Sequence, residues 1–220
     1  MAVMERLEFR LLTDGSSDAV LIHPITWILQ QHFRFAINGT WADLRRLPNP
    51  PKDLRGRIEV ALDLYPCDVL FIHRDAEGES LEGRVAEIED AVVGLSDPQV
   101  PVVLVRMQEA WFLIDEPALR CAAGNPHSGV SLTMPAIDTL EQIPDPKRML
   151  YDLLLKASEL TGRKRKKFNP GRQVRRLGEL IEDYSPLRRL TAFRHAENET
   201  LTTLRDCLDA VPTIDRRRKQ

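Results

Sequence analysis

The chain has 220 residues, of which 43% are hydrophobic and 29% are charged, a composition that excludes disordered and fibrous proteins. Its net charge of −2 is unevenly distributed, because residues 145–195 hold fourteen Lys or Arg against six Asp or Glu, and this asymmetry favours an anionic partner. No stretch has the roughly 18 apolar residues of a membrane span, and no signal-peptide core is seen at the start, so we expect a cytoplasmic protein without membrane contact.

The first half of the chain alternates expected strands and helices. Residues 7–13 predict a short strand, and a helix follows from Ser16 or Ser17, either of which can cap it. Further strands are expected at residues 35–41, 67–73 and 100–107, the last ending near Glu109, with helices at 54–64 and 81–93 between them. This alternation predicts an α/β fold in which helices flank a parallel sheet.

The second half of the chain is expected to be helical. Asp145-Pro146 and Ser185-Pro186 each place a cap and a first-turn proline before an apolar pattern of helical period, and the second helix reaches about Leu208. These patterns predict two regions. An α/β core spans residues 1–125, and a helical, basic region at 126–220 packs on that core. The three cysteines are too scattered for disulfides or zinc.

Acidic residues terminate three of the expected strands: Asp14 and Asp18, Asp75 and Glu77, and Glu109. Gly15 permits a sharp bend from strand to helix after the first of them. Ligands of parallel sheets lie beyond the carboxyl ends of the strands, so these side chains are expected at one edge. Gathered carboxylates repel each other unless a positive charge lies among them, and Mg²⁺ or Mn²⁺ would supply it.

These segments carry a resemblance to the Toprim family. "LLTDGSSD" resembles the opening Toprim motif, a strand ending in Glu-Gly before a small-residue turn and a second acid, as in nucleases of the overcoming-lysogenisation-defect type. "VLFIHRDAEGE" resembles the second motif, an Asp-x-Asp pair with a nearby glycine. "VPVVLVRMQEAWFLID" and "YSPLRRLTAFR" are similar to an uncharacterised Toprim-like family of about this length. The resemblance implies a Toprim/Rossmann-like fold with a helical C-terminal part.

The resemblance further implies metal-dependent cleavage of a phosphodiester in DNA or RNA, in phage defence or DNA repair beside an ATPase partner. In this interpretation the metal ligands are Asp14, Asp18, Asp75 and Glu77. Glu109 joins Asp14, Asp75 and Glu77 among the catalytic residues, where it supports a second metal or positions the water. Ser16, Ser17 and His73 are secondary candidates, the serines as phosphate contacts or helix caps.

The chain departs from the Toprim pattern in two ways. The first acid is normally glutamate, and the shorter Asp14 stands here. The second motif has two registers, because either Asp75 and Glu77 or His73 and Asp75 can be the pair. Structural roles stay open as well: Asp14 as a turn residue, Asp18 as a first-turn helix acid, His73 as a core residue and Glu109 as a solvated one.

The segment from Arg163 to Arg176, "RKRKKFNPGRQVRR", holds eight cations and no acid. Such density neutralises phosphates, and Phe168 among the cations could stack on an unpaired base. A solvated loop between two helices is the alternative, which "NPG" supports. The predicted nucleic-acid contacts are Arg163, Lys164, Arg165, Lys166, Lys167, Arg172, Arg175 and Arg176.

Three functions are therefore compatible with the sequence. The first is a Toprim-type nuclease, and the second is a Toprim-like subunit that has lost catalysis and binds nucleic acid or protein. The third is a receiver-like phosphoacceptor, which also groups acids at strand ends but has an adjacent acidic pair after its first strand that this chain lacks.

Overall fold

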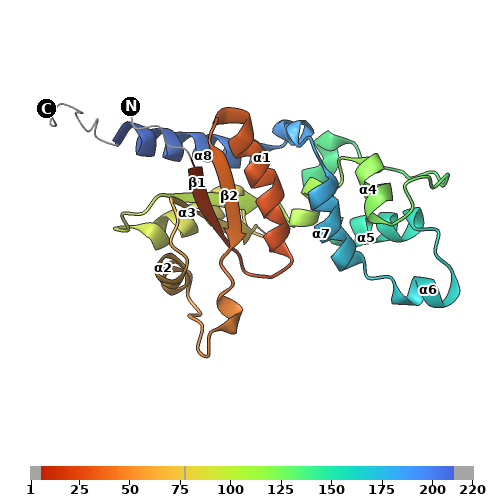
Figure 1. Ribbon diagram of the computed structural model, residues 1–220, viewed down its shortest axis with the longest axis horizontal. Coiled ribbons are helices and arrows are strands. Elements are labelled where there is room, and N and C mark those ends of the chain that lie inside the picture. Colours follow the sequence, from red (N-terminus) through yellow and green to blue (C-terminus); the bar gives the residue numbers. More distant parts are fainter. Residues whose placement is uncertain (1–5, 77, 211–220) are drawn as a thin grey trace, which may run out of the picture.

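The computed structural model describes residues 6–76 and 78–210 of the chain (Figure 1). Within these residues four parallel strands form a sheet in the order β2-β1-β3-β4. The strands are β1 (Arg6–Leu12), β2 (Ala36–Trp41), β3 (Val69–Asp75) and β4 (Gln99–Leu104). The predicted α/β fold with a parallel sheet flanked by helices is confirmed.

The central strands are apolar because both faces of the sheet are covered. Val69 to Ile72 of β3 are fully buried, and in β1 the buried residues alternate with partly exposed Glu8 and Arg10. Pro101 lies in β4, which is an edge strand and therefore tolerates a residue without a backbone N–H.

Helices of the α/β part follow the strands as expected. They are the 3-10 helices η1 (Asp18–Leu21) and η2 (Leu44–Arg46) and the helices α1 (Ile22–His32), α2 (Leu54–Leu64) and α3 (Leu81–Val92). The Asp53 and Ser80 side chains cap α2 and α3 by accepting from backbone N–H groups at 2.8 and 3.0 Å. Figure 1 shows α1 on one side of the sheet and α2 with α3 on the other.

The order of the strands creates a crevice beside the end of β1. The chain leaves β1 toward β2 on one side, and it leaves the neighbouring β3 toward β4 on the other. Strand ends at such a switch point diverge, and ligands of doubly wound sheets bind there. The acids predicted after β1 and in β3 border this crevice.

The remaining helices form a second lobe beside the sheet, and the last one returns to it (Figure 1). They are η3 (Gln108–Phe112), α4 (Glu116–Ala122), η4 (Ile137–Gln142), α5 (Pro146–Ala157), α6 (Gly162–Lys167), α7 (Pro170–Leu180), η5 (Ser185–Arg189) and α8 (Thr191–Ala210). Helix α8 packs on β4. We call the part from α4 to α7 the helical lobe.

Helix α8 is fixed by a partly buried ionic cluster. The Glu197 carboxylate accepts from Arg188 Nη2 at 2.7 Å and lies 2.8 Å from His32 Nε2 of α1. Arg188 also lies 4.9 Å from the ring centroid of Trp27, so it joins η5, α1 and α8. In the described part of the chain, no helix has both the length and the apolar character needed to cross a bilayer.

Three local expectations differ from the structure. Strand β4 ends at Leu104 rather than near Glu109, because the backbone turns at Arg106 with a positive φ of 67°. The segment after Tyr184 forms the short η5 before α8 begins at Thr191, so Ser185 does not cap a long helix. The loop that was the alternative for the basic segment is not seen, because this segment contains α6 and the first part of α7, which Asn169 caps.

Candidate functional site

The loop after β1 is held by short hydrogen bonds. The buried Asp18 carboxylate accepts from Gly15 N at 2.9 Å and from Ser17 Oγ at 2.8 Å. Thr13 Oγ1 donates to Gly15 O at 2.6 Å and accepts from Trp41 Nε1 at 2.9 Å. Asp18 therefore closes a turn, and Ser17 supports it instead of capping a helix.

Asp14 lies among arginines. Its carboxylate pairs with Arg57 of α2 and, at 3.0 Å, with Arg74 Nε of β3. Arg57 also donates to Thr13 O at 2.5 Å, and Arg74 pairs with Glu87 at 2.8 Å. The side chain of Asp14 is 47% exposed, so the two guanidinium groups compensate its charge at the rim of the crevice.

His73 and Asp75 lie next to each other near the end of β3. His73 is fully buried, with Nδ1 2.9 Å from Val102 O and Nε2 3.4 Å from Asp75 Oδ1. Burial lowers the pKa of His73, but the Asp75 carboxylate, the charge of Asp18 and the Val102 carbonyl together outweigh burial, and the net pKa is raised. In the described chain no hydrogen bond reaches the buried Asp75 Oδ1. Asp75 thus favours the protonated form of His73, and the second predicted partner of Asp75, Glu77, lies outside the described residues.

Glu109 lies on η3 and is buried, with an exposed fraction of 3%. Burial raises its pKa, and the charges of Asp75 and Asp18 act in the same direction, while Lys147 Nζ at 3.8 Å opposes them. The fold thus brings Glu109, Asp75 and Asp18 within electrostatic reach of one another. Asp14 belongs to a separate cluster with Arg57 and Arg74.

A cleft of about 350 Å³ lies between the sheet edge and the helical lobe. Its lining residues are Ser16, Ser17, Gln108, Glu109, Tyr151, Asn169, Gly171, Arg172, Val174 and Arg175. The Oε1 atom of buried Gln108 has no hydrogen-bond partner among the described residues. An acid, two amides, three hydroxyl-bearing side chains and two arginines therefore line one cavity, which we call the edge cleft.

Helix α7 supplies the basic wall of the edge cleft. A capping residue at its start and a glycine at its contact with η1 fix its position. The Asn169 side chain accepts from Arg172 N at 3.1 Å, and Pro170 lies in the first turn. A Cβ atom added at Gly178 would lie 2.5 Å from Val20 Cγ2, so only glycine lets α7 pack this closely on η1. Arg175 Nη2 donates to Ser16 O at 3.2 Å and joins the two walls.

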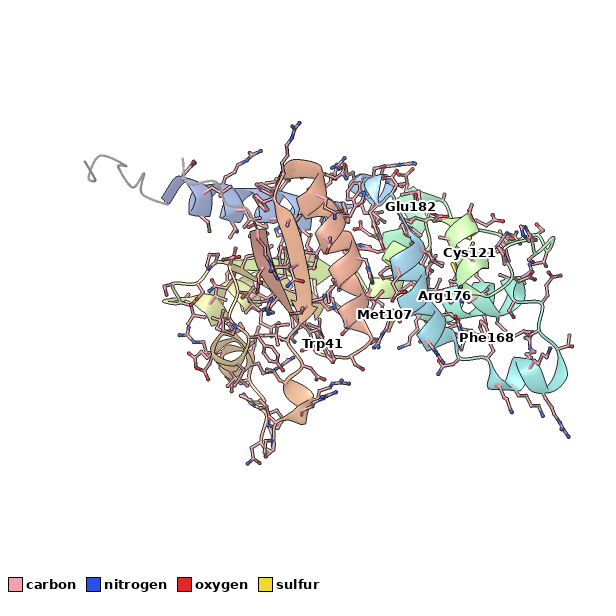
Figure 2. The ribbon with its side chains drawn as sticks, in the orientation of Figure 1. Trp41, Met107, Cys121, Phe168, Arg176 and Glu182 are labelled. Carbon is pink, nitrogen blue, oxygen red and sulfur yellow. The ribbon has the colours of Figure 1, made fainter. Side chains whose placement is uncertain are left out.

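The predicted basic contacts divide into two groups. Arg172 and Arg175 line the edge cleft, and Arg176 is exposed on the same helix (Figure 2). The other five, Arg163, Lys164, Arg165, Lys166 and Lys167, are exposed on α6. Helix α6 lies at the end of the helical lobe away from the sheet (Figure 1).

Several site residues escaped the sequence analysis. Arg57 and Arg74 lie far from Asp14 in the chain, although Arg74 directly precedes Asp75. Gln108 and Tyr151 reach the cleft from η3 and α5, and Asn169 reaches it from the cap of α7. Asn169-Pro170 is a typical helix start, and reading it so would have placed Arg172 and Arg175 on a helix.

The carboxylates do not fit a Mg²⁺ or Mn²⁺ site as arranged. Within residues 6–76 and 78–210, no three or more His, Cys, Asp or Glu gather closely enough to hold an ion. Two arginines occupy the surroundings of Asp14, and Asp18 is engaged in its turn. The carboxylates of Asp18 and Glu109 near Asp75 are of a type that binds these ions. Each of them already has another partner, however: the turn after β1 for Asp18 and Lys147 for Glu109. Metal binding stays a prediction.

Comparison of the chain with models of protein families, with curated proteins and with solved structures gave no match.

Proposed function

We propose that the chain binds nucleic acid and that the edge cleft receives a backbone phosphate. The observation that supports this most directly is that Arg172 and Arg175 line the same cavity as Ser16 and Ser17 at the carboxyl edge of the sheet. Guanidinium and hydroxyl groups are the usual donors to phosphate oxygens. The cleft also lies beside the switch point, where parallel sheets bind their ligands.

The distribution of charge favours a polymer over a mononucleotide. Arg176 is exposed on the same helix as the two cleft arginines, and five more exposed cations lie on the preceding helix α6. On the opposite side Arg45, Arg46 and Lys52 are exposed between β2 and α2. Several phosphates can therefore be neutralised at once, which releases counterions and gives affinity that falls steeply with salt.

Glu109 is compatible with an anionic ligand because its pKa is raised by burial and by neighbouring acids. A carboxyl group of this kind takes up a proton readily when a phosphate lies beside it. The protonated group can then donate a hydrogen bond instead of repelling the ligand.

The experiment measures binding of fluorescently labelled DNA and RNA oligonucleotides by anisotropy, in EDTA and over a series of salt concentrations. The double variant Arg172→Ala, Arg175→Ala should bind more weakly. Its plot of log affinity against log salt should also be flatter by about 1.4 to 1.8, since each lost phosphate contact changes the slope by about 0.7 to 0.9.

The matched control is Arg34→Ala, an exposed arginine before β2, at the opposite edge of the sheet. It should leave affinity and slope unchanged. If no oligonucleotide binds at low salt, or if the double variant behaves like Arg34→Ala, nucleic-acid binding by this cleft is wrong.

A second candidate is the divalent-metal-dependent cleavage that the Toprim resemblance implies. It is favoured by the proximity of Glu109 to Asp75 and Asp18, and by the buried Asp75 Oδ1, which accepts no hydrogen bond from the described residues. Titration calorimetry with Mn²⁺ tests it: micromolar binding lost in Asp75→Ala and kept in the exposed-site control Asp90→Ala supports cleavage. Absence of binding together with inactivity on all nucleic acids would eliminate it. The ATPase partner and the role in defence or repair stay predictions.

A further inference from the structure

A second cavity, of about 580 Å³, adjoins the edge cleft. Its walls include Trp41 from the end of β2, Tyr65 from the end of α2, Arg45 and Arg46 from η2, and Arg175 from α7. Arg175 lines both cavities. We call this second cavity the tryptophan pocket, and Figure 2 shows Trp41 and the nearby helix α7, on which Arg176 is labelled.

The indole of Trp41 is held in one orientation. Its Nε1 donates to Thr13 Oγ1 at 2.9 Å, and the same hydroxyl donates to Gly15 O at 2.6 Å. The loop that presents Ser16 and Ser17 to the edge cleft therefore also positions Trp41. The loop after β1 thus fixes the positions of both the serines proposed to contact phosphate and the indole ring of Trp41.

Arg45 completes a stacked arrangement on Trp41. Its guanidinium carbon lies 4.4 Å from the ring centroid. Asp43 holds Arg45 through two hydrogen bonds of 2.7 and 2.9 Å, and Tyr65 Oη donates to Asp43 O at 3.0 Å. Aromatic rings and guanidinium planes are the surfaces on which unpaired bases stack.

Charge surrounds the tryptophan pocket in a way that suits a nucleotide. Arg46 and Arg175 can contact phosphates on its two sides, and Lys52 lies beyond Arg45 in a smaller cavity that Trp41 also lines. Glu179 adds an acceptor to the wall, which matches an exocyclic amino group of a base.

We infer that the tryptophan pocket receives an unpaired nucleobase next to the phosphate in the edge cleft, so that the preferred ligand is single-stranded nucleic acid. This inference rests on the proposed function and adds the strand form to it. In a duplex the bases are stacked and paired, so they present no free face to Trp41. Stacking tolerates every base, and binding therefore depends on strand form more than on sequence.

Intrinsic fluorescence gives a direct test, because the three tryptophans differ in exposure. Trp27 and Trp111 are buried, with exposed fractions of 8% and 1%, whereas Trp41 is half-buried at the pocket. Unlabelled single strands and hairpin duplexes of equal phosphate number are titrated into wild-type protein, Trp41→Phe and Trp41→Ala. Circular dichroism confirms that each variant is folded.

Single strands should quench the wild-type fluorescence and bind more tightly than duplexes. Trp41→Phe should abolish the quenching while it retains an aromatic face and most of the affinity. Trp41→Ala should weaken single-strand binding at least about 5-fold and leave duplex binding unchanged, as expected for loss of one stacked base. If Trp41→Ala fails to fold, the comparison of fluorescence quenching in the wild type and in Trp41→Phe still tests the inference.

The outcomes separate this inference from the proposed function. Equal binding of single strands and duplexes without quenching, or quenching that persists in Trp41→Phe, would overturn the base pocket and leave nucleic-acid binding intact. Absence of binding to both strand forms at low salt would instead overturn the proposed function itself.

Discussion

Arg175 on α7 donates a hydrogen bond to the carbonyl oxygen of Ser16, in the loop after the first strand, at 3.2 Å. The two residues are separated by 159 positions in the sequence. This contact closes the edge cleft from both sides. The position of α7 therefore decides whether the basic residues of the helical lobe and the serines of the sheet edge can act on one ligand.

Gly178→Ala should displace α7 without changing any charge. The new Cβ would lie 2.5 Å from Val20 Cγ2 and 2.9 Å from His23 Cδ2. We expect the free energy of unfolding to fall by about 1 to 3 kcal/mol, although alanine has the higher helix propensity, and oligonucleotide affinity to fall with it. Chemical denaturation measures the first effect. Gly129→Ala, which meets no atom within 4 Å, is the control and should be neutral.

Glu109→Gln should stabilise the protein while it changes the cleft. Because burial raises the pKa of Glu109, the folded chain binds a proton there more readily than the unfolded chain. Stability therefore increases as the pH falls from neutral through the folded pKa. The glutamine variant should be more stable at pH 7, by an amount on the order of 1 kcal/mol, and should lose this part of the pH dependence. The exposed control Glu89→Gln should leave the dependence of stability on pH unchanged. The same unchanged dependence in Glu109→Gln would contradict the prediction.

Asp14→Asn distinguishes the two proposed functions. Removing the carboxylate takes away the negative charge that Arg57 and Arg74 now compensate, while Arg74 keeps its pair with Glu87. Affinity for nucleic acid in EDTA should therefore rise and its salt dependence should steepen. A metal-dependent nuclease would instead lose activity. Asp53 caps α2 near Arg57, and Asp53→Asn retains a capping oxygen, so it serves as a control that should leave affinity unchanged.

Glu197→Gln should loosen α8. Burial alone would raise the pKa of Glu197, but hydrogen bonds from Arg188 and His32 outweigh it and lower the pKa. The stabilisation is present above the unfolded pKa of about 4.3 and is lost as the pH falls through the lower folded value. We expect a loss of about 2 kcal/mol at pH 7. Thermal unfolding against pH measures it, with exposed Asp206→Asn as the control. Equal melting curves for the two variants would refute the role of the cluster.

Much of the fold could be predicted from local patterns. The continuous apolar run of β3 and the alternation of strands with amphipathic helices indicate a parallel sheet, and α2 and α5 begin at capping residues. Strand ends were less predictable, because the turn at Arg106 depends on a positive φ that no glycine signals. The helical start at Asn169 was obscured by "NPG", which is also a common turn sequence.

The site was predictable only as a list of charges. Sequence patterns placed Asp18, Asp75 and Glu109 at one edge, and the fold brings them within electrostatic reach. They could not reveal that arginines from α2 and β3 would surround Asp14, because ion pairs depend on long-range packing. For the same reason the proximity of α7 to the loop after β1 was not visible.

The return of α8 to β4 has a consequence for biosynthesis. One side of Gln99–Leu104 is covered by Thr191–Ala210, so this side of the outer strand stays uncovered until α8 has left the ribosome, although α3 already packs on the same strand. Contacts so distant along the chain form slowly, and bare strands are prone to self-association. The helical lobe, whose contacts are more local, can assemble before the α/β unit that precedes it is complete. Nascent chains arrested before Thr191 should therefore depend on chaperones.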